Sequence, residues 1–180
     1  MNLNVFFKIT YGLYVVSSSN GSKANGFISN TVFQVTSEPP QFAVASHKNN
    51  YTTDIIREGK VFAISILQQD YHPDIIGTFG YRSGKEIEKF GNFKYMTGKT
   101  GAPILLTDTI GWLECEVIKT FDLGTHILFI GNVVDGDVID DSAEPLTYNY
   151  YHEVKKGKAP KNSPTYIDPQ KFKAFPPKIS

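Results

Sequence analysis

Apolar residues occur along this chain in short runs that alternate with polar positions, a spacing typical of half-buried strands. Turn residues separate the runs: Asn20-Gly21 is a strong hairpin signal, and Pro39-Pro40 should end a strand because proline cannot donate to a ladder. The pattern predicts strands in seven segments, which are residues 13–19, 25–40, 41–46, 61–67, 102–106, 111–122 and 125–139.

The second of these segments, "NGFISNTVFQVTSEPP", departs from simple alternation. Ser29, Asn30 and Thr31 interrupt its apolar positions, behind Gly26. One interpretation is a β-bulge with polar residues at the surface. The other is a backbone edge that Gly26 leaves open to close approach, where a flat polar heterocycle meets main-chain and side-chain hydrogen-bonding groups.

Few segments show helical spacing. Short helices are predicted at residues 3–11, at 51–59, from Pro73 and again after Ser83. Gly59 is expected to be the C-cap of the second helix, and His72 is an acceptable N-cap for the third, in which Pro73 occupies the first position. Many short strands with few helices predict a mainly β protein, a closed or partly closed barrel with small helices at its ends.

Composition narrows the possible classes of protein. The 180 residues, 41% of them hydrophobic, suffice for one globular domain with a well-buried core. The formal net charge of +0 argues against nucleic acid as a partner, because phosphate binding normally leaves an excess of Lys and Arg. No signal peptide or membrane-spanning run is recognisable, and a single cysteine, Cys115, suits a reducing compartment. We therefore expect a cytoplasmic protein without membrane contact.

The composition changes after Tyr151. The chain becomes basic and rich in proline, "EVKKGKAPKNSPTYIDPQKFKAFPPKIS". Such a composition predicts an extended arm or linker over residues 155–180 rather than packed structure.

Two loops offer groups suited to an anion. Ser46, Lys48, Asn50 and Thr52 surround the start of the helix at 51–59, and a helix N-terminus with hydroxyls and a lysine nearby can bind phosphate. The stretch "FGYRSGKE" brings an arginine, a serine and glycines before the next predicted helix. The simpler alternatives are ordinary N-capping in the first loop and a solvated second loop.

His126 shares a strand face with Leu128 and Ile130. It is either a satisfied histidine of the core or rim, or a histidine in a cofactor pocket that steadies developing charge. No pair of histidines has the spacing of metal ligands, so no metal site is predicted. Cys115 alternates toward the core, as a small buried hydrophobe would.

Several stretches together resemble the flavin reductase-like family of FMN-binding split β-barrels. They are "KITYGLYVVSS", "NGFISNTVFQVTSEPP", "FGYRSGKEIEKF" and "LECEV" followed by "GTHILFIGNVVDG", in the family's order from about Phe7 to about Tyr151. The resemblance implies a Greek-key split barrel at residues 1–154, with the arm at 155–180. It is strongest to flavoredoxin and to the flavin reductase domain of high-molecular-weight rubredoxin. A single cysteine cannot make the four-cysteine iron site of a rubredoxin module, so we expect that half to be absent or to be a separate protein.

The resemblance also implies roles for individual residues. Ile28, Ser29, Asn30 and Thr31 match the segment that holds the isoalloxazine and ribityl parts of FMN. Ser46, His47, Lys48, Asn50 and Thr52 match the loop that takes ribityl and phosphate, and Phe79, Arg82 and Ser83 match the second phosphate-side segment. His126 matches a histidine near the flavin, with Thr125 in place of the family's usual aspartate. Tyr148 resembles an aromatic residue that lines the pocket.

The implied activity is hydride transfer from NADH or NADPH, bound transiently, to FMN, followed by reduction of flavin, ferric iron or a small redox protein. The alternative is an FMN-binding electron carrier that a partner protein reduces. A third interpretation is a barrel that has lost its cofactor and serves as an interaction module. The family further implies a homodimer with FMN near the subunit interface, and a rubredoxin-like protein is a possible acceptor that the basic arm could contact.

Overall fold

The computed structural model describes residues 2–168 and residue 170. Its strands are β1 (Tyr14–Ser19), β2 (Ala24–Ser29), β3 (Val32–Ser37), β4 (Pro40–His47), β5 (Val61–Leu67), β6 (Tyr95–Thr97), β7 (Pro103–Leu105), β8 (Thr109–Asp122) and β9 (His126–Val138). Its helices are the 3-10 helix η1 (Leu3–Lys8) and the α-helices α1 (Tyr51–Gly59), α2 (Pro73–Tyr81) and α3 (Tyr148–Glu153). The prediction of a mainly β protein with a few short helices is confirmed.

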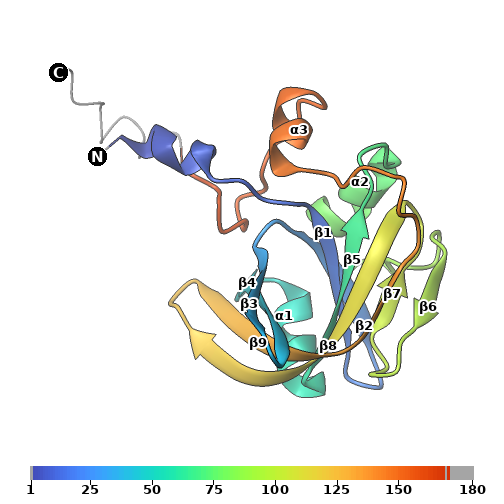
Figure 1. Cartoon of the computed structure of the whole chain (residues 1–180). Helices are drawn as coiled ribbons and strands as arrows, with labels where there is room; N and C mark the ends of the chain where they lie inside the picture. The colour runs from blue at the N-terminus through green and yellow to red at the C-terminus, as the bar shows by residue number, and fades with distance from the viewer. Residues whose placement is uncertain (1, 169, 171–180) are drawn as a thin grey trace.

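Seven strands form one antiparallel sheet in the order β2-β1-β5-β8-β9-β4-β3, and β6 and β7 form a separate pair. The two edge strands, β2 and β3, are neighbours in sequence, joined only through Asn30 and Thr31. The sheet must therefore curl until its edges meet, and Ala45 N donates to Thr31 O at 3.2 Å beside that junction. Figure 1 shows the resulting barrel, with α1 near β4 and α2 and α3 at one end.

The single strand expected at residues 25–40 is wrong, because the polar interruption is the crossing between β2 and β3. Ser29 is the last residue of β2 and Val32 the first of β3. Each half pairs with a different strand, β2 with β1 and β3 with β4. The chain thus passes from one edge of the curled sheet to the other, which requires a change of direction that a continuous strand does not allow.

Helix α1 begins and ends with identifiable caps. The Asn50 side chain accepts from Thr52 N at 3.0 Å, an N-cap whose loss typically costs about 1 kcal/mol. Gly59 is the last helical residue, and the expectation that it is the C-cap is wrong. Lys60 is the C-cap, with φ 57°, and its N–H donates to Ile56 O. Gly59 is needed for space, since a Cβ there would lie 2.0 Å from Ser19 O.

Helix α2 begins as predicted, with His72 as N-cap and Pro73 at the first position. The helix expected after Ser83 is absent from the described residues. Residues 84–86 form a single turn, in which the N–H groups of Glu86 and Ile87 donate to Ser83 O at 3.0 and 3.2 Å.

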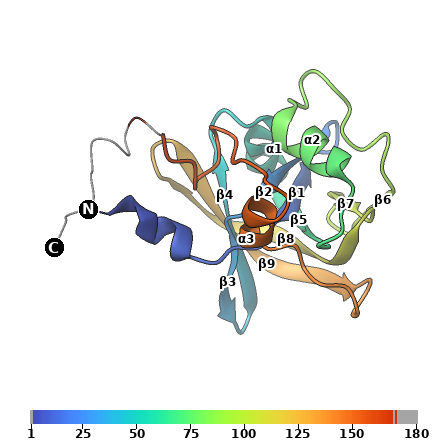
Figure 2. The ribbon, with the colours of Figure 1, turned by 90° about the horizontal axis from the view of Figure 1, so that it is seen from above.

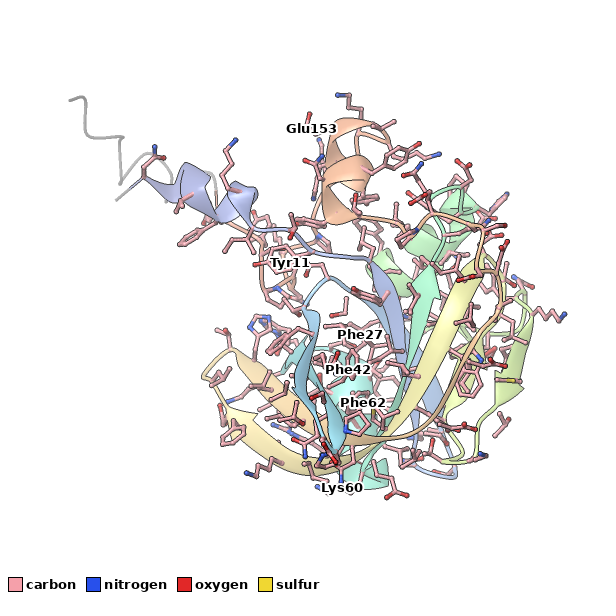
Figure 3. The ribbon with its side chains drawn as sticks, in the orientation of Figure 1. Tyr11, Phe27, Phe42, Lys60, Phe62 and Glu153 are labelled. Atoms are coloured by element: carbon pink, nitrogen blue, oxygen red, sulfur yellow. The ribbon has the colours of Figure 1, made fainter. Side chains whose placement is uncertain are left out.

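Both faces of the sheet are covered at β1, so successive side chains enter different clusters. Val16 lies inside the barrel with Phe27, Phe62 and Phe129, and Figure 3 shows Phe27, Phe42 and Phe62 directed into that interior. Val15 lies on the other face, in a cluster with residues of α2. Each fully buried side chain of this size contributes roughly 1.5–3 kcal/mol to the free energy of folding. Together these side chains stabilise the sheet on which the site is built.

Helix η1 runs away from the barrel in both views (Figures 1 and 2). Among its described side chains, Val5 and Phe6 are exposed, as is Ile9 directly after it.

Candidate functional site

A pocket of about 480 Å³ lies between β2, the start of α1, α2 and residues 158–164. This volume is in the range of about 300–1,000 Å³ that is usual for small-molecule sites. Its apolar lining comes mainly from Leu13, Phe27, Ile28, Ile76, Phe79 and Tyr148. Polar groups enter from three sides, from the β2–β3 crossing, from the start of α1 and from the segment after α2.

The β2–β3 crossing presents Ser29 and Asn30 to the pocket, and both are buried. The Asn30 side-chain nitrogen Nδ2 donates to Thr165 Oγ1 at 2.8 Å. Thr31 does not line the pocket. Its hydroxyl donates to Ala45 O and its N–H donates to Ser29 Oγ, both at 3.3 Å, so it fastens the crossing to β4.

Near α1, the structure separates residues that the sequence groups together. His47 and Asn50 line the pocket, together with Tyr51. Ser46, Lys48 and Thr52 do not. Their partners explain why: Ser46 bonds Thr53 at 2.6 Å, the Lys48 ammonium pairs with Asp122 at 2.7 Å, and the Thr52 hydroxyl accepts from Asn25 at 3.1 Å.

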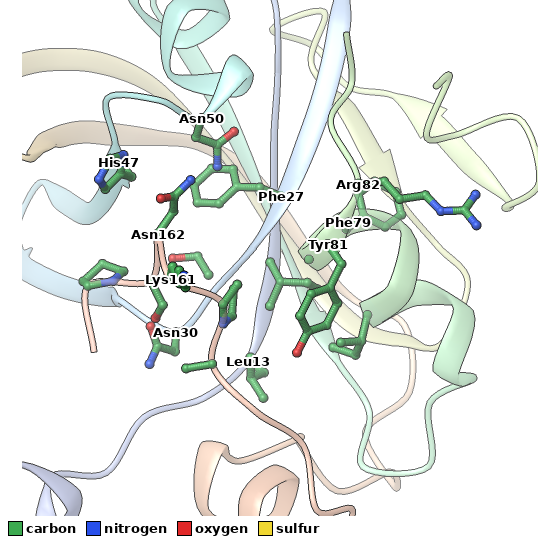
Figure 4. A pocket seen from close by; sticks show the side chains of 18 of the residues that line it. Leu13, Phe27, Asn30, His47, Asn50, Phe79, Tyr81, Arg82, Lys161 and Asn162 are labelled. Carbon is green, nitrogen blue, oxygen red and sulfur yellow. The ribbon is translucent and has the colours of Figure 1, made fainter. Parts of the chain in front are cut away.

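Phe79 within α2, and Arg82 and Ser83 directly after it, line the pocket. Phe79 is buried and its ring packs against Phe90, with the ring centroids 5.1 Å apart. Arg82 is exposed, and in Figure 4 its guanidinium points away from the other labelled side chains.

Lys89 also lines the pocket, although no motif of the sequence pointed to it. It is only 4% exposed, and its ammonium donates to Gly26 O at 2.8 Å and to Phe79 O at 3.4 Å. No ion pair of Lys89 occurs within the described residues, and burial lowers its pKa to about 8. The signal in "EIEKF" is weak, since a charged run after a glycine is typical of an exposed turn.

His126 lies on the outer face of β9, half-exposed rather than in the core. Its ring meets His47 edge-on with the centroids 4.8 Å apart, its Nδ1 bonds Thr125 Oγ1 at 2.9 Å, and its Nε2 bonds Asn162 O at 3.4 Å. Partial burial and the neighbouring His47 lower its pKa, against the opposing hydrogen bond to Asn162. Its contacts with His47 and Asn162, which both line the pocket, place it at the rim of the site.

The segment after α3 is packed against this site, contrary to the expectation of an unpacked arm. We call residues 158–165 the C-terminal strap. The main chain of the strap accepts from Tyr81 Oη at 2.6 Å through Lys158 O, and the Tyr148 hydroxyl bonds Thr165 Oγ1 at 2.9 Å. Figure 4 shows the strap crossing the pocket between Asn50 and Asn30. Residues 169 and 171–180 of the predicted arm lie outside the described residues.

Among the described residues, no helix is long and apolar enough to span a membrane. Nor, in this part of the chain, is any group of three or more His, Cys, Asp or Glu side chains placed to hold a metal ion.

Comparison with known proteins assigns the chain to a family. The model of the flavin reductase-like domain matches residues 6–156. A ferric-chelate reductase (NAD(P)H) from Archaeoglobus fulgidus is 44% identical over 93% of this chain and 99% of its own length. A high molecular weight rubredoxin from Moorella thermoacetica is 42% identical over 92% of this chain and 72% of its own length.

Among solved structures, the flavin reductase HpaC in complex with NADP+ is similar with a TM-score of 0.70 and 26% identity, over 81% of this chain and 89% of that one. The fold and the matched family agree with the resemblance that the sequence motifs indicated. This chain is therefore a member of the flavin reductase-like family.

Proposed function

We propose that this chain is an FMN-dependent NAD(P)H oxidoreductase, and that the pocket between β2 and α2 holds the flavin. The observation that carries the proposal is the buried ammonium of Lys89, which has no carboxylate partner among the described residues and lies at the edge of a pocket with an apolar lining. A buried cation is costly unless a counter-ion joins it, and a flavin phosphate is such a counter-ion. The bound flavin would supply the redox chemistry, by accepting a hydride from the nicotinamide and passing electrons to the acceptor.

The residues present fit an FMN group. Phe27, Ile28 and Phe79 offer an apolar surface for a ring system, and Asn30 at the β2–β3 crossing offers an amide to its polar edge. Lys89 and Ser83 lie on the side where the phosphate would bind, with Asn50 at the start of α1. The volume of about 480 Å³ is within the usual range for a small-molecule site.

The chain's own part in the reaction is to hold and orient the two ring systems and to shield them. The chemistry needs no dedicated acid or base from the protein, so the site should act by positioning two flat ring systems against each other. His126, at the rim with His47, is placed to help position the nicotinamide rather than to transfer a proton.

The roles proposed from the family for Ser46, Lys48, Thr31 and Thr52 change in the light of their contacts. Thr31 and Ser46 support the pocket through Ala45 and Thr53. Thr52 bonds Asn25, and Asn25 itself lines the pocket. We therefore propose indirect, positioning roles for these three, and place the phosphate with Lys89 rather than with Lys48, which pairs with Asp122.

We propose ferric chelates, free flavin or a small redox protein as the acceptor. The Archaeoglobus fulgidus relative is named as a ferric-chelate reductase, and the Moorella thermoacetica relative as a high molecular weight rubredoxin. Both names support an acceptor of small size that can reach the flavin.

A homodimer is part of the same proposal. Phe33, Leu128, Ile130 and Phe121 are at least partly exposed on the outer face of β3, β9 and β8, and the strand pairing through β4 brings them into adjacent rows. Such an apolar strip on one chain is typical of a surface that another chain covers. This strip begins beside His126, so a dimer built on it would place the flavin near the interface.

The test is the visible absorption spectrum of the purified protein with FMN, before and after anaerobic addition of NADH or NADPH. A bound flavin spectrum that bleaches within turnover time supports the reductase. A bound flavin that neither NADH nor NADPH reduces, but that accepts electrons from a reduced partner protein, would indicate an electron carrier instead. A protein that takes up no FMN would contradict the proposal.

A further inference from the structure

The C-terminal strap is attached at both ends to residues of the pocket. At one end, Lys158 O accepts from Tyr81 Oη at 2.6 Å and from Tyr151 Oη at 3.3 Å. At the other end, Thr165 Oγ1 accepts from Asn30 Nδ2 at 2.8 Å and bonds Tyr148 Oη at 2.9 Å. Between them, Asn162 O bonds His126 at 3.4 Å. Each of these partners belongs to the barrel, α2 or α3, so the strap bridges the pocket.

The strap has a defined shape of its own. Ser163 N donates to Pro160 O at 2.9 Å and Tyr166 N donates to Ser163 O at 3.0 Å, which makes two successive turns. Pro160 and Pro164 also restrict the backbone. A segment that is already shaped loses little entropy when it closes on a ligand.

The strap covers the pocket and does not fill it. The cavity of about 480 Å³ is bounded by strap residues, so this space remains when the strap is in place. The strap also holds the side chain of Asn30, which we propose meets the polar edge of the ring. A ligand in the pocket would therefore lie between β2, α2 and the strap, and these hydrogen bonds hold the strap over it.

We propose that the C-terminal strap is a wall of the cofactor site that slows FMN release, so that FMN is retained through turnover instead of exchanging as a substrate. This inference rests on the proposed function, since it assumes that the pocket takes FMN. It assigns roles to residues beyond the barrel: Asn162 lines the pocket, and Thr165 would act on the flavin through Asn30, as a positioning residue.

The test measures the rate at which FMN leaves the full-length protein, followed by the fluorescence of released FMN after dilution. The double variant Tyr81→Phe/Thr165→Val removes hydroxyls that fasten the two ends of the strap. Each lost hydrogen bond weakens closure, so we expect dissociation at least about tenfold faster than in wild type. The matched control is Tyr95→Phe/Thr36→Val, which removes the same groups outside the pocket lining and should keep the wild-type rate.

A second measurement requires no variant. Trypsin cleaves after Lys158 and Lys161 when the strap opens, and cleavage after Lys99 in the β6–β7 turn serves as the internal reference. We expect FMN to slow cleavage at the two strap sites by about tenfold or more relative to Lys99, since a ligand beneath the strap favours its closed form.

The outcomes separate the two proposals. An unchanged rate of FMN release in the strap variant would contradict the role proposed for the strap and leave the proposed function intact. Unchanged cleavage at the two strap sites with FMN bound would do the same. A wild-type protein that does not bind FMN would overturn both, and this is visible before any variant is compared.

Discussion

At the scale of single residues, Lys89 connects stability with function. Its ammonium is removed from water, no carboxylate of the described part of the chain balances it, and burial lowers its pKa to about 8. The two carbonyl partners, Gly26 O and Phe79 O, compensate only in part. A residue that costs stability in the free protein and faces a pocket is a strong candidate for contact with an anionic ligand.

Substituting Lys89→Met removes the charge and keeps the length of the side chain. We expect the FMN dissociation constant to rise at least about tenfold, because a charge-assisted contact to phosphate is lost. The apo protein should gain stability, with a Tm higher by about 2–4 °C, because the buried charge is gone. FMN titration and thermal unfolding of the apo form measure the two effects.

The matched control is Lys48→Met, because the Lys48 side chain makes a surface ion pair with Asp122 and does not line the pocket. Surface pairs contribute little, so neither FMN affinity nor Tm should change appreciably. If Lys48→Met lost affinity and Lys89→Met did not, the phosphate would be at the start of α1 as the sequence first indicated.

The pH dependence follows from the same group. Lys89 is protonated below its pKa of about 8 in the free protein, and only the protonated form attracts phosphate. FMN affinity should therefore change little between about pH 7, where the phosphate is fully ionised, and this pKa, and should fall above it by at most about tenfold per pH unit. Titrations between about pH 7 and pH 9 measure this, and a profile in Lys89→Met equal to that of wild type would contradict the assignment.

The stability of the apo protein should change in the opposite direction. Because the folded-state pKa of Lys89 is lower than the unfolded value, the unfolded chain binds more protons between the two pKa values. The free energy of unfolding should therefore increase with pH from about 8 toward the usual lysine range, relative to Lys89→Met. Denaturant unfolding at matched pH values checks the sign.

At the scale of elements, Glu114 shows how β8 holds the β6–β7 hairpin. Its side chain is fully buried, and its carboxylate accepts from Lys99 N at 2.8 Å, Thr100 N at 2.9 Å and Thr100 Oγ1 at 2.8 Å. The turn between β6 and β7 thus closes on a side chain from a different sheet. A neutral amide can supply only one of the two acceptor oxygens.

We expect Glu114→Gln to lower the free energy of unfolding by about 1–3 kcal/mol, because a buried N–H would face an NH₂ group. FMN affinity should not change, since neither Glu114 nor the hairpin turn lines the pocket. Glu116→Gln on the same strand is the control, as Glu116 is exposed. Equal stability of the two variants in urea would show that the carboxylate does not hold the hairpin.

The elements also show how far the sequence alone could go. Helix α2 was predicted with its cap because Pro73 and His72 act locally. The β2–β3 crossing could not be predicted from the sequence, because it depends on the two edges of the sheet meeting. The helix predicted after Ser83 is a turn at residues 84–86 instead. It leads to Lys89, whose ammonium donates to Gly26 O, far away in the sequence. The strap has the composition of a linker, and its packing is visible only from its contacts in the fold, such as those with Asn30 and Tyr81.

At the scale of the whole molecule, the exposed apolar strip on β3, β8 and β9 requires an explanation. Phe33 is 53% exposed and Phe121 46%, and both lie on the outer face of the barrel. Helix η1 also extends away from the barrel with exposed Val5 and Phe6 (Figure 2). Neither feature is covered within the described chain, and a second copy could cover both.

Most homodimers have two-fold symmetry, so the same strip on each chain would face its own copy. A charge introduced into the strip is then repeated on the partner, and the like charges repel. We expect Phe121→Asp to weaken dimerisation at least about hundredfold while Tm of the monomer is little changed, because the side chain is exposed.

Sedimentation equilibrium over a range of concentrations measures this dimerisation directly. Val138→Asp is the control: Val138 is 63% exposed at the far end of β9, where an added charge should leave dimerisation unaltered. A wild-type chain that stays monomeric, or a Phe121→Asp chain that dimerises like wild type, would show that this strip is not the interface.

If FMN affinity falls together with dimerisation in Phe121→Asp, the flavin site is completed by the partner chain, as expected for a strip that begins beside His126. If FMN affinity stays, each chain holds its flavin alone, under its own strap.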